Sequence, residues 1–420
     1  MEKEKILEIL NDWNFWKRDQ DTGITREKYL DLLSTYEKTE QIIAIVGVRR
    51  AGKSTIMMQY IKNIISKGLV NPENTLYVNF EDRRFYNLSL ELLNKIYETY
   101  LEYLRPKGKV YIFLDEIQNV NMWEKFVRTL HERKEAQVFI SGSSSKLLSS
   151  ELSTVLTGRT LIINVLPASF KEFLMFKNIK IKDVMDVIDK RYEIKSKFRE
   201  FMEFGGFPLV ILKDNKKEIL EGYFDDIIEK DVIQRYKIKN AGKLKDIAKF
   251  YLSNISSPVS FNKIKNFLSI PIDTVERYSY YLENACLLFF VKRFSFSLKE
   301  QEKSPRKVYC IDTGLRNAIS FRFRENLGQL AENIVFLELK RRYKEIYYWK
   351  DSQQKEVDFV VKEGIKDIKL IQVCWNVEDY DTKKREINSL LSCMKKLNVN
   401  EGTIITEDYE GKEIINTESG

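Results

Sequence analysis

The chain has 420 residues, of which 43% are hydrophobic and 31% are charged. At about 150 residues per domain, this length predicts roughly two to three domains with ample apolar cores, and the composition excludes a disordered or collagen-like chain. A single histidine, His131, excludes most histidine-based metal sites and catalytic triads.

The cysteines and the chain start indicate the compartment. The four cysteines form no C-x-x-C pair, which excludes a zinc knuckle and a disulfide framework and indicates a reducing environment. The charged residues 1–5 lead into no long apolar run, so we expect no secretory signal. The longest near-continuous apolar run, residues 285–291, is far too short to span a bilayer. We therefore expect a soluble, cytoplasmic protein without a membrane partner.

The charge is unevenly distributed. Lys and Arg number 70 and Asp and Glu 62, for a net charge of +8. Residues 231–310 hold 15 basic and 7 acidic side chains, a surplus of 8 that equals that of the whole chain. Such a block favours a module that binds a polyanion, and a lysine-rich solvated surface is the alternative.

The first part of the chain has the pattern of an α/β domain. Apolar residues at near-helical spacing within residues 1–40 predict a helix that packs on the next domain or walls a nucleotide base. Short apolar runs then alternate with helical patterns, which predicts a parallel sheet. The runs are residues 42–46, 76–80, 110–114, 138–140 and 161–165, and the helical patterns are residues 54–67, 88–104 and 123–134. We assign this domain to residues 1–180.

Three further segments follow. Helical patterns at 168–176 and 184–204 indicate a helical lid or linker, which we place at residues 181–230. The basic segment, residues 231–311, shows helices followed by two strands, the order of a winged helix-turn-helix. Its predicted elements are 244–255, 261–268, 274–284, 287–296 and 307–311. Residues 312–420 predict another α/β domain, with a long helix at 327–343 and strands at 346–349, 357–361 and 370–375.

The motif G-x-x-x-x-G-K-[ST] occupies residues 47–54, between a predicted strand and a predicted helix. Its glycines allow backbone N–H groups to approach phosphates, Lys53 supplies a positive charge, and Ser54 offers a hydroxyl to Mg²⁺. We therefore predict ATP and Mg²⁺ as cofactors. The predicted nucleotide-binding residues are Gly47, Arg49, Arg50, Ala51, Gly52, Lys53, Ser54 and Thr55.

Two adjacent carboxylates end the strand predicted at 110–114. Asp115 is placed to hold Mg²⁺ together with Ser54, and Glu116 to orient or deprotonate the attacking water. Both follow the carboxyl end of a strand, where open α/β sheets bind ligands. Ser143, after the next strand, is our candidate to contact the γ-phosphate, with a helix cap as the alternative. Arg159 is our candidate for stabilising transition-state charge, with a surface arginine as the alternative.

Together these motifs resemble prokaryotic, especially archaeal, AAA-type ATPases that carry a C-terminal domain of unknown function. The matching stretches lie within residues 10–375 and are GVRRAGKST, VNFEDRRF, FLDEIQNV, SGSSSKLLS, LTGRT, LPASFKEF, FGGFP, IDTGLR, LGQLAEN and EVDFVV. The resemblance implies ATP hydrolysis in the first half, then a winged helix and a domain similar to restriction-endonuclease-like folds.

The resemblance also maps a nuclease-type site onto Glu332, Asp358 and Gln372. Such sites use carboxylates for a divalent metal and a lysine to polarise water. Here Gln372 stands where a glutamate is expected and Cys374 where a lysine is expected, so we expect a degenerate site without cleavage. Lys362 and Lys369 are the lysines nearby in sequence that could substitute.

We therefore predict an ATP-hydrolysing AAA-type ATPase that binds DNA through its basic segment, and that could form a homo-oligomer with ATP at subunit interfaces. Two alternatives remain: an ATP-regulated nuclease, and a nucleotide-controlled switch that binds protein partners.

Overall fold

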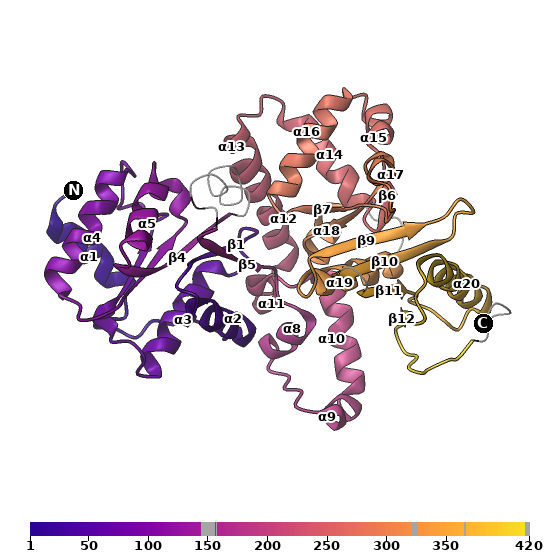
Figure 1. Ribbon diagram of the computed structural model, residues 1–420, viewed down its shortest axis with the longest axis horizontal. Helices are drawn as coiled ribbons and strands as arrows, with labels where there is room; N and C mark the ends of the chain where they lie inside the picture. The colour runs from indigo at the N-terminus through magenta and orange to yellow at the C-terminus, as the bar shows by residue number, and fades with distance from the viewer. Residues whose placement is uncertain (144–155, 157, 321–325, 365–366, 416–420) are drawn as a thin grey trace.

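The computed structural model describes residues 1–143, 156, 158–320, 326–364 and 367–415. Its first domain is built on a five-stranded parallel sheet with the strand order β2-β3-β4-β1-β5 (Figure 1). The strands are β1 (Ile42–Gly47), β2 (Thr75–Asn79), β3 (Val110–Asp115), β4 (Ala136–Ser143) and β5 (Thr160–Val165). These are the five strands that the apolar runs predict, so the α/β fold class is confirmed.

Helices cover both faces of this sheet because alternate side chains of each strand point to opposite faces. Ile43 and Ile45 pack toward α2 (Glu27–Glu37) and α3 (Lys53–Ser66), whereas Ala44 and Val46 pack toward the other face. That other face is covered by α1 (Lys3–Trp13), α4 (Leu90–Leu104) and α5 (Trp123–Glu132). The sheet is thus buried on both sides, and its carboxyl edge is where the site described below lies.

A helical region joins the sheet domain to the rest of the chain (Figure 1). It contains α8 (Phe170–Phe176), α9 (Val184–Asp189), α10 (Arg191–Phe204), α11 (Pro208–Leu212) and α12 (Lys216–Asp226). The helix predicted at 184–204 is therefore wrong as one element, because the chain breaks between α9 and α10. After α12 comes a π-helix, η3 (Ile227–Ile233), and then α13 (Gln234–Tyr236). Residue 231, where we place a domain start, lies inside this unbroken helical stretch.

The basic segment folds around a three-stranded sheet with the order β6-β8-β7. Its elements in chain order are α14 (Ala241–Ser253), β6 (Ser257–Val259), α15 (Phe261–Leu268), α16 (Ile272–Asn284), β7 (Leu288–Val291), α17 (Leu298–Lys303) and β8 (Arg306–Cys310). The strand predicted at 287–296 is shorter than expected, since β7 ends at Val291.

The last part of the chain is a mixed sheet between two helices. The strand order is β12-β11-β10-β9, formed by β9 (Glu345–Lys350), β10 (Glu356–Glu363), β11 (Asp367–Val373) and β12 (Thr403–Ile405). One face packs against α19 (Leu327–Lys340) and the other against α20 (Tyr380–Leu397). The helix α18 (Thr313–Ile319) links this part to β8.

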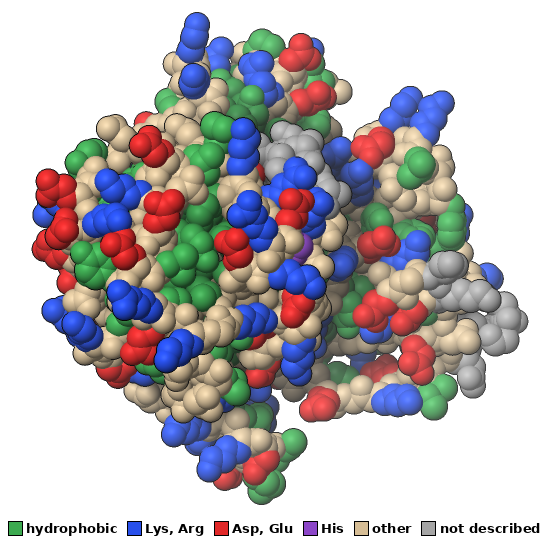
Figure 2. Space-filling view, turned by 60° about the vertical axis from the view of Figure 1, so that its left-hand side comes forward, with side chains coloured by type: hydrophobic (Ala, Val, Ile, Leu, Met, Phe, Trp, Pro, Cys, Tyr) green, Lys and Arg blue, Asp and Glu red, His purple; other side chains and the backbone are tan. Residues whose placement is uncertain are grey.

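The length of the helices and the distribution of surface charge can be compared with what the sequence predicts. Within the described residues, no helix combines the length and the apolar character that a bilayer-crossing helix has. On the face of the first domain shown in Figure 2, basic and acidic side chains are interspersed. No broad basic surface therefore stands out on that face of the first domain.

Candidate nucleotide site

The loop between β1 and α3 depends on its two glycines. A Cβ atom on Gly47 would lie 2.1 Å from the carbonyl oxygen of Val165 on the neighbouring strand β5. Gly52 has a φ of 96° and immediately precedes α3, so an L-residue there would be strained. Arg50 also has a positive φ, 69°. This tight loop delivers the N-terminus of a 14-residue helix to the sheet edge, an arrangement that attracts anions.

Lys53 and Glu116 meet at this edge. The Lys53 side chain is 4% exposed, and its Nζ donates hydrogen bonds to the carbonyl oxygens of Gly47 and Val48, both at 3.3 Å. The same Nζ lies 3.7 Å from Oε1 of Glu116. The lysine of the loop and the second acid of the β3 pair are therefore neighbours, as expected for residues that act on one nucleotide.

Asp115 is held by hydroxyl groups. Its Oδ2 accepts a hydrogen bond from the Tyr77 hydroxyl at 2.7 Å, and its Oδ1 accepts one from Ser141. Burial and the adjacent charge of Glu116 raise the pKa of Asp115, while hydrogen bonds from Ser141, Ser54 and Tyr77 oppose that rise. Ser54 thus lies close enough to Asp115 to lower its pKa, as expected for two groups that would share one Mg²⁺.

Glu116 sits in a strained backbone conformation. Its φ of 53° is left-handed, which is uncommon for a non-glycine residue and concentrates at functional sites. Its backbone N–H donates to Oγ of Ser141 at 3.1 Å, and its carboxylate accepts from Gln118. Ser141 therefore binds both acids of the pair and orients them relative to each other.

Sequence reasoning selected Ser143 on β4 and missed Ser141. Ser141 is on β4, the strand next to β3 in the sheet. Ser141 is level with Asp115, since Leu114 is paired with Ile140 in the preceding register position. Only the register of β4 on β3 distinguishes Ser141 from Ser143, and the apolar runs of the sequence do not specify that register. Ser143 is paired with Gly47 through the backbone, and its side chain lies outside the described part of the structure, as do residues 144–149 of the same motif.

The remaining loop residues contact other parts of the chain. Arg49 and Arg50 form ion pairs with the helical region, described further below. The Ala51 carbonyl accepts a hydrogen bond from Arg26 at 3.0 Å, and Arg26 is also paired with Glu172 at 2.7 Å. Thr55 is exposed in the first turn of α3. Arg26 thus connects the loop to α8. These segments are far apart in the sequence, so their contact could not be predicted from it.

Arg159 lies at the amino ends of β1 and β5, whereas the P-loop follows the carboxyl end of β1. Its carbonyl oxygen accepts a hydrogen bond from the N–H of Ile42, the first residue of β1. At about 3.3 Å per residue, the length of β1 separates this point from Gly47 by roughly 16 Å. The guanidinium is 38% exposed and pairs with Glu132 at 3.3 Å. Arg159 is therefore not part of the site of its own chain.

The C-terminal residues Glu332, Asp358 and Gln372 come together, but around a lysine. Nζ of Lys307 lies 2.9 Å from Glu332, 2.8 Å from Asp358 and 2.8 Å from Glu356. Gln372 accepts a hydrogen bond from the Asp358 N–H at 3.0 Å. Burial alone would lower the pKa of Lys307, yet the attraction of Asp358 and Glu332 outweighs it and raises that pKa.

Sequence reasoning missed Lys307, which is 25 or more residues from its partners in sequence. Of the two lysines proposed as substitutes, Lys362 and Lys369, the second pairs with Glu363 on the surface. Cys374 is buried, and its Sγ donates to the Asn376 carbonyl at 3.3 Å. Among the described residues, no group of three or more His, Cys, Asp or Glu side chains is arranged to hold a metal ion.

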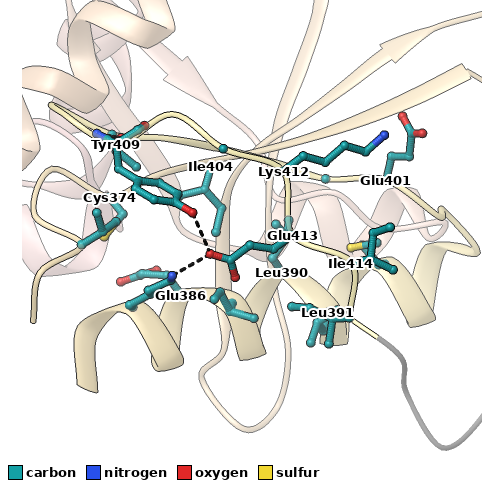
Figure 3. A pocket seen from close by; sticks show the side chains of 18 of the residues that line it. Cys374, Glu386, Leu390, Leu391, Glu401, Ile404, Tyr409, Lys412, Glu413 and Ile414 are labelled. Atoms are coloured by element: carbon teal, nitrogen blue, oxygen red, sulfur yellow. Dashed lines mark hydrogen bonds and ion pairs between the residues drawn. The ribbon is translucent and has the colours of Figure 1, made fainter. Parts of the chain in front are cut away.

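A cavity in the C-terminal part of the chain is remote from the P-loop. It has a volume of about 620 Å³ and lies between α20, β12 and residues 406–415. Figure 3 shows Tyr409 facing Glu413, whose Oε1 also pairs with Lys383 at 2.7 Å. Figure 1 places α20 at the far end of the molecule from β1. This cavity therefore contributes nothing to the nucleotide site.

Comparison with known proteins agrees with the class that the loop and the acidic pair define, a protein with an AAA-type P-loop domain. Residues 39–174 match a family described as an AAA domain. Residues 195–326 and 327–418 match two families described as domains of unknown function, DUF8612 and DUF4143. The resemblance predicted from the motifs is thereby confirmed for the AAA domain and for a C-terminal domain of unknown function.

Two relatives span most of the chain. The uncharacterized protein MJ1544 of Methanocaldococcus jannaschii is 37% identical over 388 residues, covering 89% of this chain and 84% of that protein. An uncharacterized protein of Haemophilus influenzae is 32% identical over 401 residues, covering 93% and 97%. The chain belongs to the family of these proteins. The Walker-type ATPase PABY2304 of Pyrococcus abyssi is similar with a TM-score of 0.45 and 12% identity, over 70% of this chain and 95% of that one.

Proposed function

We propose that this protein binds and hydrolyses ATP with Mg²⁺ at the edge of the five-stranded sheet. The observation that carries the proposal is the meeting of Lys53, Ser54, Asp115 and Glu116 at the carboxyl ends of β1 and β3. The pair Lys53 and Ser54 is about 60 positions from the pair Asp115 and Glu116 in sequence, so their convergence is a property of the fold.

The residues present fit a nucleoside triphosphate and Mg²⁺. The loop has no room for a side chain at Gly47, is restricted at Gly52 by a φ of 96°, and ends at a helix N-terminus, which suits phosphate. Ser54 and Asp115 supply oxygen donors, the ligands that Mg²⁺ takes in proteins. When bound, Mg²⁺ neutralises charge that develops on the phosphoryl oxygens.

Each residue then has a distinct task. Lys53 exchanges its contacts with the loop carbonyls and Glu116 for a contact with phosphate oxygen. Glu116, released from Lys53, accepts a proton from the attacking water or orients it. Ser141 and Tyr77 act as positioning residues, since their hydroxyls hold the Asp115 carboxylate and, for Ser141, the Glu116 backbone.

The test is phosphate release from ATP by the full chain, with Mg²⁺ and with EDTA, and with double-stranded, single-stranded or branched DNA added. We expect Mg²⁺-dependent release that Lys53→Ala abolishes. Stimulation by DNA would support a DNA-directed ATPase. Slow release that no DNA alters would favour a nucleotide-controlled switch, and an absence of nucleotide binding in the wild type would overturn the proposal.

We also propose DNA as a partner of the segment from α14 to β8. In support, the order of its helices and strands is that of a winged helix, and its exposed side chains include Lys263 and Lys265 on α15 and Arg277 on α16. Tyr280 on α16 is 59% exposed, whereas Tyr278 on the same helix is 6% exposed. Tyr278 is therefore part of the core.

Part of the basic surplus is used inside the protein. Lys307 is buried among three carboxylates, Lys292 and Arg306 both pair with Glu302, and Arg293 donates to the Lys350 carbonyl. These four side chains are therefore less suited to phosphate contacts than the net charge of the segment suggests. Lys263 and Lys265, which are exposed on α15, are therefore our candidates for phosphate contacts.

We expect the double variant Lys263→Ala, Lys265→Ala to weaken DNA binding and reduce its salt dependence. Each neutralised phosphate contributes about −0.9 to the slope of log K against log salt, so the slope should fall by nearly 2. The measurement is fluorescence anisotropy of labelled duplex DNA over a salt series. Lys292→Ala is the matched control, because Lys292 is already paired with Glu302. Equal slopes for the wild type and the double variant would remove α15 from the interface.

We expect no metal-dependent DNA cleavage by the C-terminal cluster. Nζ of Lys307 lies within 2.9 Å of all three carboxylates, so an ammonium takes the position that a divalent ion would need. Gln372 adds no charge, and losing one electrostatic group of a catalytic site costs about 10²–10³ in rate. The measurement is a time course on supercoiled, linear and branched DNA with Mg²⁺ or Mn²⁺. Nicking by the wild type that disappears in Asp358→Ala would promote the ATP-regulated nuclease.

A further inference from the structure

The P-loop carries three cations, and carboxylates of the protein neutralise all three. Lys53 faces Glu116, as described above. Nη2 of Arg49 lies 3.2 Å from Oδ1 of Asp231, and its Nη1 lies 2.9 Å from Glu81. Arg50 lies 3.6 Å from Asp226. A triphosphate that enters this loop therefore meets cations that already have partners.

Two of these partners are on one helical stretch outside the sheet domain. Asp226 ends α12, and Asp231 lies in the π-helix η3. The Asp231 side chain is 3% exposed and that of Arg49 is 18% exposed, so their ion pair is poorly screened by solvent. A π-helix is rare and is often found at functional sites. The P-loop thus forms ion pairs with an irregular helix that belongs to another part of the chain.

The same stretch is firmly attached to α16. The ring of Tyr236, which ends α13, stacks on Tyr281 with centroids 3.6 Å apart and planes 8° apart. The Tyr236 hydroxyl also accepts a hydrogen bond from Asn284 at 3.2 Å. Only five positions separate Asp231 from Tyr236, so a shift of η3 moves a contact of α16.

We propose that Asp231 competes with the nucleotide phosphates for Arg49, and that this competition reports the nucleotide state to α16. The inference rests on the proposed nucleotide site. When phosphate is bound, Arg49 interacts with the phosphate as well as with Asp231. The ion pair between Arg49 and Asp231 therefore weakens, and η3 can repack more easily. By the reciprocity of linked equilibria, the Asp231–Arg49 contact must then lower nucleotide affinity. Asp226 and Arg50 repeat the arrangement at a more exposed position.

The consequence has a definite sign. Asp231→Asn removes the competing charge while preserving the shape of the side chain, so it should tighten nucleotide binding. Couplings of this kind are about fivefold or more. If Asp231 instead held Arg49 in place for the phosphate, the same variant would weaken binding. The sign therefore separates a competitor from a positioning residue.

The experiment measures binding of a fluorescent ATP analogue with Mg²⁺, and hydrogen exchange of residues 227–253 with and without ATPγS. In the wild type, ATPγS should raise exchange in η3 and α13. In Asp231→Asn, we expect affinity about fivefold higher and exchange already raised without nucleotide. Asp226→Asn serves as a second, milder variant if Asp231→Asn fails to fold, with the same directions expected.

Two matched variants sharpen the test. Glu81→Gln also removes a partner of Arg49 but leaves the helical stretch intact, so affinity should rise while the exchange response is retained. Asp225→Asn removes an exposed carboxylate of α12 that pairs with Lys245 and should change neither readout. Unchanged or weaker binding by Asp231→Asn, with normal binding by the wild type, overturns this inference alone. Absence of binding by the wild type overturns the proposed nucleotide site itself.

Discussion

Glu116→Gln is expected to bind ATP at least as tightly as the wild type and to hydrolyse it about 10²–10⁴-fold more slowly, the contribution of a general base. Binding should not suffer because the carboxylate of Glu116 competes with phosphate for Lys53, from which it lies 3.7 Å away. The amide keeps the shape of the side chain and the contact with Gln118, but it cannot accept a proton from water. The measurements are single-turnover hydrolysis and binding of a fluorescent ATP analogue.

Lys53→Ala should show the reverse pattern and is the matched comparison. Lys53 acts on phosphates in the ground state, and a charge-assisted hydrogen bond of this kind is worth about 1.5–3 kcal/mol. ATP affinity should therefore fall by at least about tenfold, and turnover should be lost with it. Turnover by Glu116→Gln close to that of the wild type would remove Glu116 from its role. Tight binding by Lys53→Ala would do the same for Lys53.

Features that are local in sequence could be predicted, and these include the sheet and most of the site. The five strands are short apolar runs bounded by helical patterns, so period and length alone identify them. The P-loop residues are contiguous, and Asp115 and Glu116 end a strand that the same reasoning finds. Because parallel strands end at one sheet edge, the approach of Lys53 to Glu116 followed from the fold class.

Contacts that depend on register or on distant segments could not be predicted. Choosing between Ser141 and Ser143 requires the pairing of β3 with β4, which an apolar run does not specify. Arg49 and Asp231 are 182 positions apart. Lys307 is on a strand of one sheet and its acidic partners are on α19 and β10, so only tertiary packing shows that an ammonium lies between them.

The position and charge of Arg159 together predict a specific role for this residue in a second copy of the chain. It precedes β5, and its carbonyl is bonded to the first residue of β1, so it lies at the edge of the sheet opposite the P-loop of its own chain. A guanidinium there reaches a γ-phosphate only if a second copy of the chain presents its own P-loop to that edge. Its side chain is 38% exposed and its partner Glu132 is 43% exposed, so neither is buried in the single chain.

We therefore propose a homo-oligomer with ATP at subunit interfaces, in which Arg159 acts on the nucleotide of a neighbouring subunit. Arg159→Ala should lower hydrolysis by about 10³–10⁵-fold, the usual contribution of such an arginine, with little change in ATP affinity because its charge matters most in the transition state. The measurements are steady-state hydrolysis, nucleotide binding and molecular mass in solution with ATP. Arg128→Ala is the matched control, since Arg128 pairs with the same Glu132 at 2.8 Å and should leave hydrolysis unchanged.

Mixing Arg159→Ala with Lys53→Ala distinguishes action between subunits from action within one. Neither variant is expected to hydrolyse ATP appreciably alone, but a mixed assembly would contain interfaces that join an intact P-loop from the first variant to an intact Arg159 from the second. Activity should therefore reappear on mixing and vanish on dilution below the concentration at which the oligomer dissociates. Full hydrolysis by Arg159→Ala alone would exclude the role. Loss of activity in Arg159→Ala without recovery on mixing would contradict action across the interface, and since Arg159 is roughly 16 Å from Gly47 in its own chain, it would point to a structural effect on β5.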